Sequence, residues 1–232
     1  MKQYISMLED VQLFARIDKE DLLRSLTCLR AQVVSVCQGQ VILRQGDPAL
    51  RFGVVLSGSA YVMTGDEQGN HNIVAVIQGK EVFGETFACA QIPALPVSVV
   101  AAEDGLVLLL EHERVITGCR NGCMAHSCLV TNLMRVIAQK NLKINQKMNI
   151  VTRKTTREKL MAFLLEQKKQ AGTSVFRIPF DRQDLADYLG VERSAMSAEL
   201  SRMKRDGLID YRKSEFEILR PLDGAREEVH HG

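Results

Sequence analysis

The sequence lacks any long hydrophobic run and any strong net charge. No apolar stretch approaches the 18 or more residues that a membrane-spanning helix needs, so no membrane partner is expected. The start, Met1 to Tyr4, has no basic segment followed by an apolar stretch, so no signal peptide is expected either. The net charge of +2 is too small to indicate a nucleic-acid partner by itself. We therefore expect a cytoplasmic protein whose six cysteines are mostly reduced.

Length and local charge are more informative. The 232 residues, 46% of them apolar, allow one large domain or two ordinary ones. Basic residues outnumber acidic ones from Arg153 to Lys169 and again from Arg193 to Arg220. Phosphate binding needs local basic patches of this kind rather than a basic total.

The first 112 residues predict a small helical start followed by a β-rich domain. Residues 1–29 show helical periodicity, with Asp18 as a candidate cap. Short apolar or alternating runs, separated by glycines and turn residues, then indicate an antiparallel barrel or jelly roll. These runs lie at 33–36, 41–43, 54–56, 60–63, 73–77, 97–102 and 106–110.

The apolar period changes after Glu111 and predicts a long helix from about Glu113 to Gln146. Two interleaved heptad rows are typical of a coiled-coil seam, and an asparagine in one row favours two strands. We interpret this helix as a homodimer seam that links domain 1–112, through 113–150, to domain 151–232. The alternative is an ordinary amphipathic helix packed on its own domain. The rows consist of Cys123, Val130, Ile137, Ile144 and Val151, and of Ser127, Met134, Asn141 and Met148.

The last third predicts a DNA-reading domain. A helix from Thr155 to Lys169 opens with a capping box and precedes a short strand at 175–178. The segment that follows predicts a helix capped by Asp181, a turn at Gly190, and a second helix from Glu192 to about Arg205. A hairpin at 207–219 completes a winged helix-turn-helix.

The second helix of this pair is the candidate recognition helix. Its N-terminal residues would lie at base edges in the major groove, where Arg193 could bind a guanine. Lys204 and Arg205 suit the phosphate backbone, and Glu199 is a further outward candidate. The predicted DNA contacts are Arg182, Gln183, Glu192, Arg193, Ser194, Ser197, Ser201, Arg202 and Lys213.

The chain from about residue 8 to 220 resembles the CRP/FNR family of bacterial transcription regulators. The resemblance rests on Gly39–Ile42, Arg44–Asp47, Val54–Gly58, Val82–Glu85 and Asp181–Ile209. It implies an α+β protein: an N-terminal double-stranded β-helix (jelly-roll) barrel of the cyclic-nucleotide-binding type, a dimerisation helix and a C-terminal winged helix-turn-helix. It also implies a homodimer that reads a near-palindromic site on double-stranded DNA and contacts RNA polymerase.

The resemblance weakens at the effector site. Members that bind cAMP carry a Gly-Glu pair and, several residues later, an Arg that pairs with the cyclic phosphate. Gly84-Glu85 is present here, but no Arg occurs between Arg51 and Arg114. A buried phosphate without a cation is costly, so cAMP is not expected and the effector is unknown. Glu85 is either a ligand residue or only a turn residue. The candidate pocket residues are Gly84, Glu85, Thr86, Val97 and Ser98.

A cysteine and histidine cluster offers a second kind of signal. Residues 1–27 contain no cysteine, so the N-terminal iron–sulfur device of oxygen-sensing family members is absent. Cys119, Cys123 and His126 have spacings that suit one helix face, where they could bind a metal or haem or act as redox-active thiols. The competing interpretation is a small buried residue at the seam and a satisfied histidine.

Two other functions remain to be distinguished. A cupin-like enzyme needs a set of ligands on its strands, but His71 is the only histidine in 31–111, so no enzyme is expected. A cyclic-nucleotide-type regulatory protein that acts through protein contacts only is the remaining alternative, and the predicted winged helix disfavours it.

Overall fold

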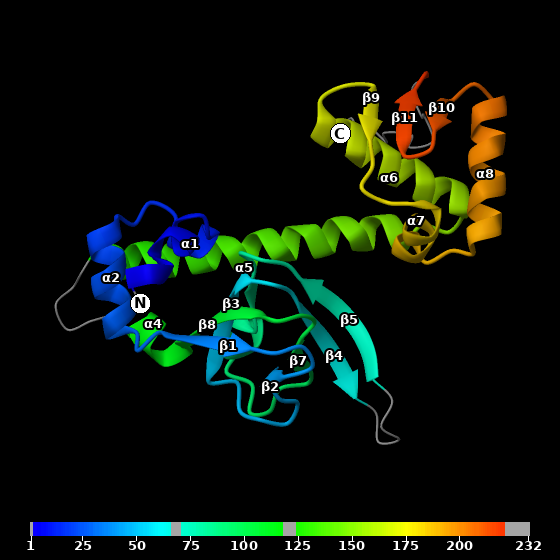
Figure 1. The fold of residues 1–232 in the computed structure, drawn as a ribbon. Helices are drawn as coiled ribbons and strands as arrows, with labels where there is room; N and C mark the ends of the chain where they lie inside the picture. Colours follow the sequence, from blue (N-terminus) through cyan, green and yellow to red (C-terminus); the bar gives the residue numbers. More distant parts are fainter. Residues whose placement is uncertain (1, 66–70, 118–123, 221–232) are drawn as a thin grey trace, which may run out of the picture. The chain divides into compact units, whose positions relative to one another are not determined.

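The computed structural model describes residues 2–65, 71–117 and 124–220 (Figure 1). The chain divides into two compact units, residues 1–140 and 141–232. Each unit buries its own set of apolar side chains, so each is described separately.

Short helices begin the first unit. They are η1 (Lys2–Tyr4), α1 (Ile5–Glu9), η2 (Gln12–Phe14) and α2 (Lys19–Cys28). The predicted cap of α2 is confirmed, because the Asp18 carboxylate accepts hydrogen bonds from the amides of Glu20 and Asp21. Leu8 and Phe14 from these helices are buried in the same cluster as strand residues such as Phe52.

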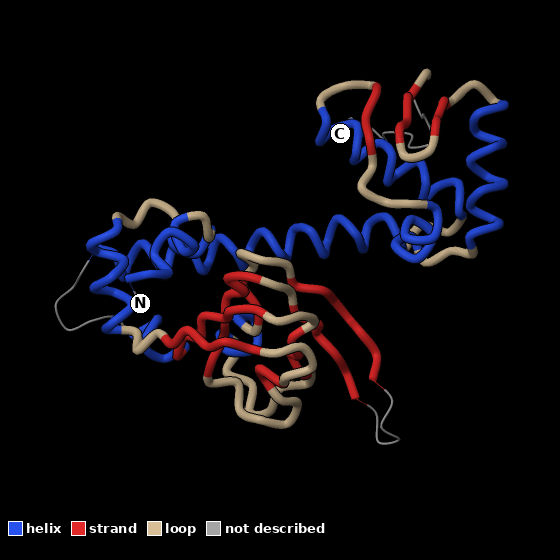
Figure 2. The backbone as a smooth tube through the Cα atoms, in the orientation of Figure 1, coloured by secondary structure: helices blue, strands red, loops and turns tan. Residues whose placement is uncertain are grey.

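Two four-stranded antiparallel sheets form the jelly roll, drawn in red in Figure 2. The seven predicted strands are confirmed, whereas the two-residue strand β6 is too short to leave a sequence signal. One sheet has the order β1 (Gln32–Val36), β8 (Gly105–Glu111), β3 (Arg51–Ser57), β6 (Val82–Phe83). The other has the order β2 (Val41–Leu43), β7 (Ser98–Ala101), β4 (Ala60–Gly65), β5 (His71–Ile77).

Three helices follow or interrupt the sheets: α3 (Glu85–Cys89), α4 (His112–Thr117) and α5 (Met124–Val151). The predicted end of the long helix at Gln146 is wrong, because α5 continues to Val151. Residues 118–123 lie outside the described part. Leu129, Leu133 and Val136 of α5 are buried in the core of the first unit, so one face of the helix does pack on its own domain.

The other face of α5 carries the predicted heptad rows. Met134, Ile144 and Met148 are more than half exposed in the single chain, and Asn141 is exposed beside them. Val130 and Ile137 are partly buried against the core of the first unit. Most side chains of the rows are therefore exposed in the single chain, although some in the first part of the rows pack against the core of the first unit.

The second unit is a winged helix. Its elements are α6 (Thr156–Ala171), β9 (Val175–Arg177), α7 (Arg182–Leu189), α8 (Arg193–Arg205), β10 (Ile209–Arg212) and β11 (Glu215–Ile218). The hairpin β10–β11 is the predicted wing. The pairing of β9 with β11, with Phe176 opposite Phe216, was not predicted and makes the sheet three-stranded. Ala186 is fully buried between the helices, as expected for a small residue where two helices approach closely.

Candidate nucleic-acid interface

The helix α7 is capped at both ends, and its C-terminal cap makes the turn to α8. Asp181 and Asp184 form a capping box at the start of α7, and Gly190 ends this helix with a φ of 60°. The Lys159 ammonium donates to the carbonyl oxygens of Leu189 and Gly190, at 3.1 and 3.4 Å, where the helix dipole favours a cation. The turn is thus held from α6 as well as from its own backbone.

Glu192 is the N-cap of α8. Its carboxylate accepts hydrogen bonds from the amides of Ser194 at 2.9 Å and Ala195 at 2.8 Å, and it also contacts the Ser194 hydroxyl. The hydrogen bond from the Ser194 hydroxyl and, after it, those from the two amides hold the pKa of the Glu192 carboxyl below its ordinary value of 4.5. The carboxylate therefore already caps its own helix, which disfavours the predicted DNA contact of Glu192.

The lowered pKa of Glu192 predicts a pH dependence of stability. The stabilisation by this cap is present above pH 4.5 and is lost as pH falls through the lower folded-state pKa, because protonation removes the acceptor charge. Denaturant unfolding of the wild type and of Glu192→Gln should show a stability difference at neutral pH that shrinks in acid. A difference that is constant with pH would contradict this role.

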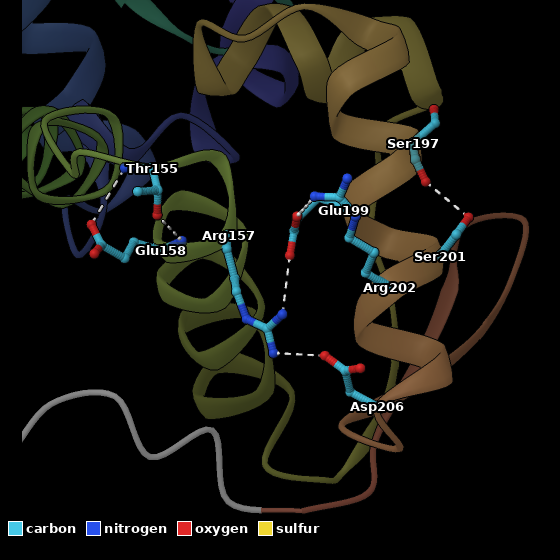
Figure 3. Close-up of polar contacts among 8 residues, drawn as sticks. All are labelled: Thr155, Arg157, Glu158, Ser197, Glu199, Ser201, Arg202 and Asp206. Carbon is cyan, nitrogen blue, oxygen red and sulfur yellow. Dashed lines mark hydrogen bonds and ion pairs between the residues drawn. The ribbon is translucent and has the colours of Figure 1, made fainter.

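The outward strip of α8 lies opposite the buried residues Met196, Leu200 and Met203. Ser197 is half-buried at its edge, and its hydroxyl donates to the Arg193 carbonyl oxygen at 2.9 Å. The Ser201 hydroxyl donates to the Ser197 carbonyl oxygen at the same distance (Figure 3). We define the outward strip by its exposed members, which are Arg193, Ser194, Ala198, Ser201, Arg202 and Arg205.

Ala198 in the middle of this strip was missed at the sequence level. Its position four residues after Ser194 and three before Ser201 places it on their face, so helical spacing alone could have found it. A small side chain there permits a close approach of the helix to a flat or grooved surface.

One flank of α8 is tied to α6 by Arg157 (Figure 3). The Arg157 guanidinium donates to Glu199 Oε1 at 3.2 Å and to Asp206 Oδ2 at 3.0 Å. Glu199 also accepts from Arg202 at 3.3 Å, and its side chain is only 12% exposed. The prediction that Glu199 points outward is wrong, because this carboxylate faces Arg157. A single guanidinium thus reaches two carboxylates that lie two helical turns apart, which restrains the rotation and tilt of α8.

Removal of Arg157 should loosen this flank. Arg157→Met is expected to destabilise the second unit by about 1 kcal/mol, since the pairs are partly exposed and screened by water. Arg153→Met, at an exposed arginine whose Nε donates to the Asn149 carbonyl oxygen, is the matched control. Urea unfolding of both variants measures the effect, and equal stabilities would show that the bridge contributes nothing.

The other flank of α8 is tied to the wing. Lys204 forms an ion pair with Asp210, and its ammonium lies 5.4 Å from the centre of the Tyr211 ring. The Ser201 and Tyr211 hydroxyls are 3.5 Å apart. Because Lys204 is held in this ion pair, its predicted phosphate contact should be weaker than that of Arg205, which forms no ion pair with any of the described residues. Polar bonds on both sides therefore hold the outward strip in one orientation.

The wing tip carries exposed positive charge. Lys213 forms the tip with a φ of 54° and is exposed. The Arg177 Nε donates to the Ser214 hydroxyl at 3.4 Å, which places a second cation beside the tip. A groove of about 850 Å³ separates the tip from the start of α7, and its lining includes Arg177, Arg182 and Lys213.

Arg182 differs from the exposed contact that the sequence predicted. Its guanidinium carbon lies 4.9 Å from the centre of the Tyr211 ring and 5.3 Å from that of Phe216, and the side chain is half-buried. Burial holds the pKa of Arg182 below its ordinary value. Arg182 therefore fastens α7 to the wing and also lines the groove. Gln183 is exposed beside it and donates to Asp187 at 2.9 Å.

The candidate effector residues lie in the first unit. Gly84, with a φ of 76°, makes the turn that precedes α3, and Glu85 is the first residue of that helix. The Glu85 carboxylate is buried and lies 2.7 Å from the Lys140 ammonium. Thr86 is exposed and Val97 is buried. The Ser98 hydroxyl accepts from the Gln45 amide at 2.9 Å, so it supports a loop.

The candidate metal ligands are only partly within the described residues. Cys119 and Cys123 lie outside them. His126 is buried, and its Nε2 lies 2.8 Å from the Arg114 carbonyl oxygen and 3.1 Å from that of Val115. Nδ1 of His126 has no hydrogen-bond partner among the described atoms. Within residues 2–65, 71–117 and 124–220, no cluster of three or more His, Cys, Asp or Glu side chains could hold a metal ion.

Comparisons with known proteins give the family. A cyclic nucleotide-binding domain matches residues 33–121, and a Crp-like helix-turn-helix domain matches residues 158–222. The chain is 24% identical over 187 residues to the transcriptional activator protein FnrA of Stutzerimonas stutzeri. This alignment covers 78% of the present chain and 74% of the relative. The activator Anr of Pseudomonas aeruginosa is also 24% identical, with coverage of 80% and 76%.

A solved structure shows the same fold. The catabolite activator protein of Thermus thermophilus superposes with a TM-score of 0.52 at 22% identity, covering 89% of this chain and 93% of that one. None of the helices in the described part is long and apolar enough to cross a membrane. With a cyclic nucleotide-binding domain and a Crp-like winged helix in one chain, this protein belongs to the CRP/FNR family of DNA-binding transcription regulators and is not an enzyme.

Proposed function

We propose that the protein is a homodimeric regulator in which two copies of the outward strip of α8 read a near-palindromic site. The observation that carries this proposal is that α8 is buried on one face, held by polar bonds on both flanks, and exposed along the strip between them. A rigid helix that presents Arg193 and serines near its N-terminus fits the major groove.

We propose different tasks for the predicted contacts. Arg193, Ser194, Ser197 and Ser201 lie where base edges would be read, and Ala198 suits the methyl group of a thymine. Arg202, Arg205 and Lys213 suit phosphates, since charged contacts of this kind add affinity without sequence information. Gln183, at the start of α7, stays a candidate backbone contact. Glu192 and Arg182 act by positioning α8 and the wing.

The dimer is proposed through α5. Met134, Asn141, Ile144 and Met148 share one exposed face of the helix, and an apolar stripe of this length is covered by an identical stripe in a two-stranded coiled coil. Two-fold symmetry would place the two recognition helices at half-sites about 34 Å apart. From the family resemblance we also propose RNA polymerase as a partner, and from the proposed DNA binding a cytoplasmic location.

The controlling signal is proposed to be something other than cAMP. Residues 52–113 contain no Arg that could pair with a cyclic phosphate, and the Glu85 carboxylate is already paired with Lys140. An unpaired phosphate in such a site would be costly to bury. The cluster at 119–126 stays a candidate for a metal or redox signal, which metal analysis of protein purified without oxygen would detect.

A salt titration tests the proposal against a regulator that acts through protein contacts only. Fragments of the source genome would be titrated with the full chain in gel-shift assays at several salt concentrations. DNA binding through phosphates should weaken steeply as salt rises, because binding releases condensed counterions. Weak binding with no salt dependence would favour the protein-contact alternative.

A further inference from the structure

Glu85 is a buried carboxylate that the DNA-binding surface does not use. Its side chain is 3% exposed, and Oε1 lies 2.7 Å from the ammonium of Lys140, which belongs to α5. The same ammonium donates to the Val82 carbonyl oxygen at 2.6 Å. Lys140 of the long helix thus contacts the residues on both sides of the turn at Gly84, which directly precedes α3.

The two partners of this ion pair differ in their exposure to solvent. Lys140 is 41% exposed and could turn into solvent, whereas Glu85 has no such freedom. A carboxylate that loses its partner in a buried site is strongly destabilising, whereas removal of both charges is much less costly. Single and double substitutions should therefore behave differently.

Lys140 also marks the point where α5 leaves the first unit. Before it, Leu129, Leu133 and Val136 are buried in the core of that unit. After it, residues 141–149 are all exposed, and Ile150 is buried in the core of the second unit. The Glu85–Lys140 pair is therefore the last attachment of α5 to the first unit among the described residues.

We infer that Lys140 and Glu85 are positioning residues that clamp α5 to the candidate effector site and so set the geometry of the DNA-binding helices. This inference rests on the proposed function, because it assumes that α5 carries the dimer seam. The predicted effector carboxylate is occupied by a lysine of the chain itself. A ligand that recruits Glu85 must displace this lysine, so ligand binding and release of α5 are linked.

The test compares full-length variants for thermal stability and for affinity to a DNA fragment that the wild type binds. Lys140→Met should lower both, with an affinity loss of about 5-fold or more, which is the lower range for coupled sites. Lys140→Arg should retain affinity because it keeps the charge. Lys143→Met, at an exposed lysine outside the heptad rows, is the matched control and should leave both unchanged.

The double variant Lys140→Met/Glu85→Gln separates positioning from simple stabilisation. It should recover most of the thermal stability, since no unpaired buried charge remains, but it should not recover the DNA affinity. Hydrogen exchange at residues 141–149 should be faster in both clamp variants than in the wild type. Recovery of affinity together with stability would overturn the inference. If the wild type itself does not bind DNA, the proposed function is wrong. If Lys140→Met binds DNA as tightly as the wild type, only the inference about Lys140 and Glu85 is wrong.

Discussion

Glutamate at both Ile144 and Met148 is expected to convert the regulator into a monomer and to weaken its binding to a palindromic site by a factor on the order of 10²–10⁴. Both side chains are more than half exposed in the single chain. In the proposed dimer they are buried against their symmetry mates, so four carboxylates would be brought together along the seam. Like charges in a buried seam cannot be tolerated, and each monomer would bind one half-site only.

The matched control for this variant is Gln146→Glu. Gln146 is exposed on the same stretch of α5 but lies in neither heptad row, so it should leave the mass in solution and the DNA affinity unchanged. Analytical ultracentrifugation measures the mass, and titration of whole and half sites measures the affinity. A double variant that remains dimeric would show that the seam lies elsewhere.

Arg193→Ala is expected to cost about 1–3 kcal/mol of binding free energy for each half-site, because a bidentate contact with guanine would be lost. The loss should be largest on the preferred sequence and small on unrelated DNA. Arg193 opens α8 and is exposed, and its neighbour Glu192 holds the first turn through the cap. The helix should therefore stay intact in the variant, which far-ultraviolet circular dichroism would verify.

Arg205→Ala provides the contrast. Arg205 lies at the far end of the outward strip, where a phosphate contact is expected. Its removal should weaken binding to all sequences alike and reduce the slope of affinity against salt. If Arg193→Ala behaved in the same uniform way, then Arg193 would contact the backbone rather than a base.

Local signals predicted most of the fold. Turn residues between short apolar runs located the seven strands, and the caps at Asp18, Thr155 and Asp181 all form as expected. These features depend on residues three or four positions apart, which a sequence displays directly. The strand β6 was missed because two residues carry no periodicity.

Contacts between distant residues could not be predicted in this way. The sequence predicts an outward Glu199, yet its carboxylate meets Arg157, which is 42 positions away. The sequence predicts Arg182 as a DNA contact, yet its guanidinium lies over wing aromatics such as Tyr211. The partner of Glu85, Lys140, is 55 positions away. From the sequence alone, a charged residue is expected to be exposed. Only the folded structure shows which distant residue it contacts.

Selection from a random double-stranded DNA library by the purified full chain tests whether a dimer reads DNA through two copies of α8. A near-palindromic sequence should be enriched, with two half-sites centred about one helical turn apart. Arg193→Ala should relax the preference at a guanine within each half-site. Enrichment of a single half-site, or of no sequence at all, would contradict a dimer that reads DNA through two copies of α8.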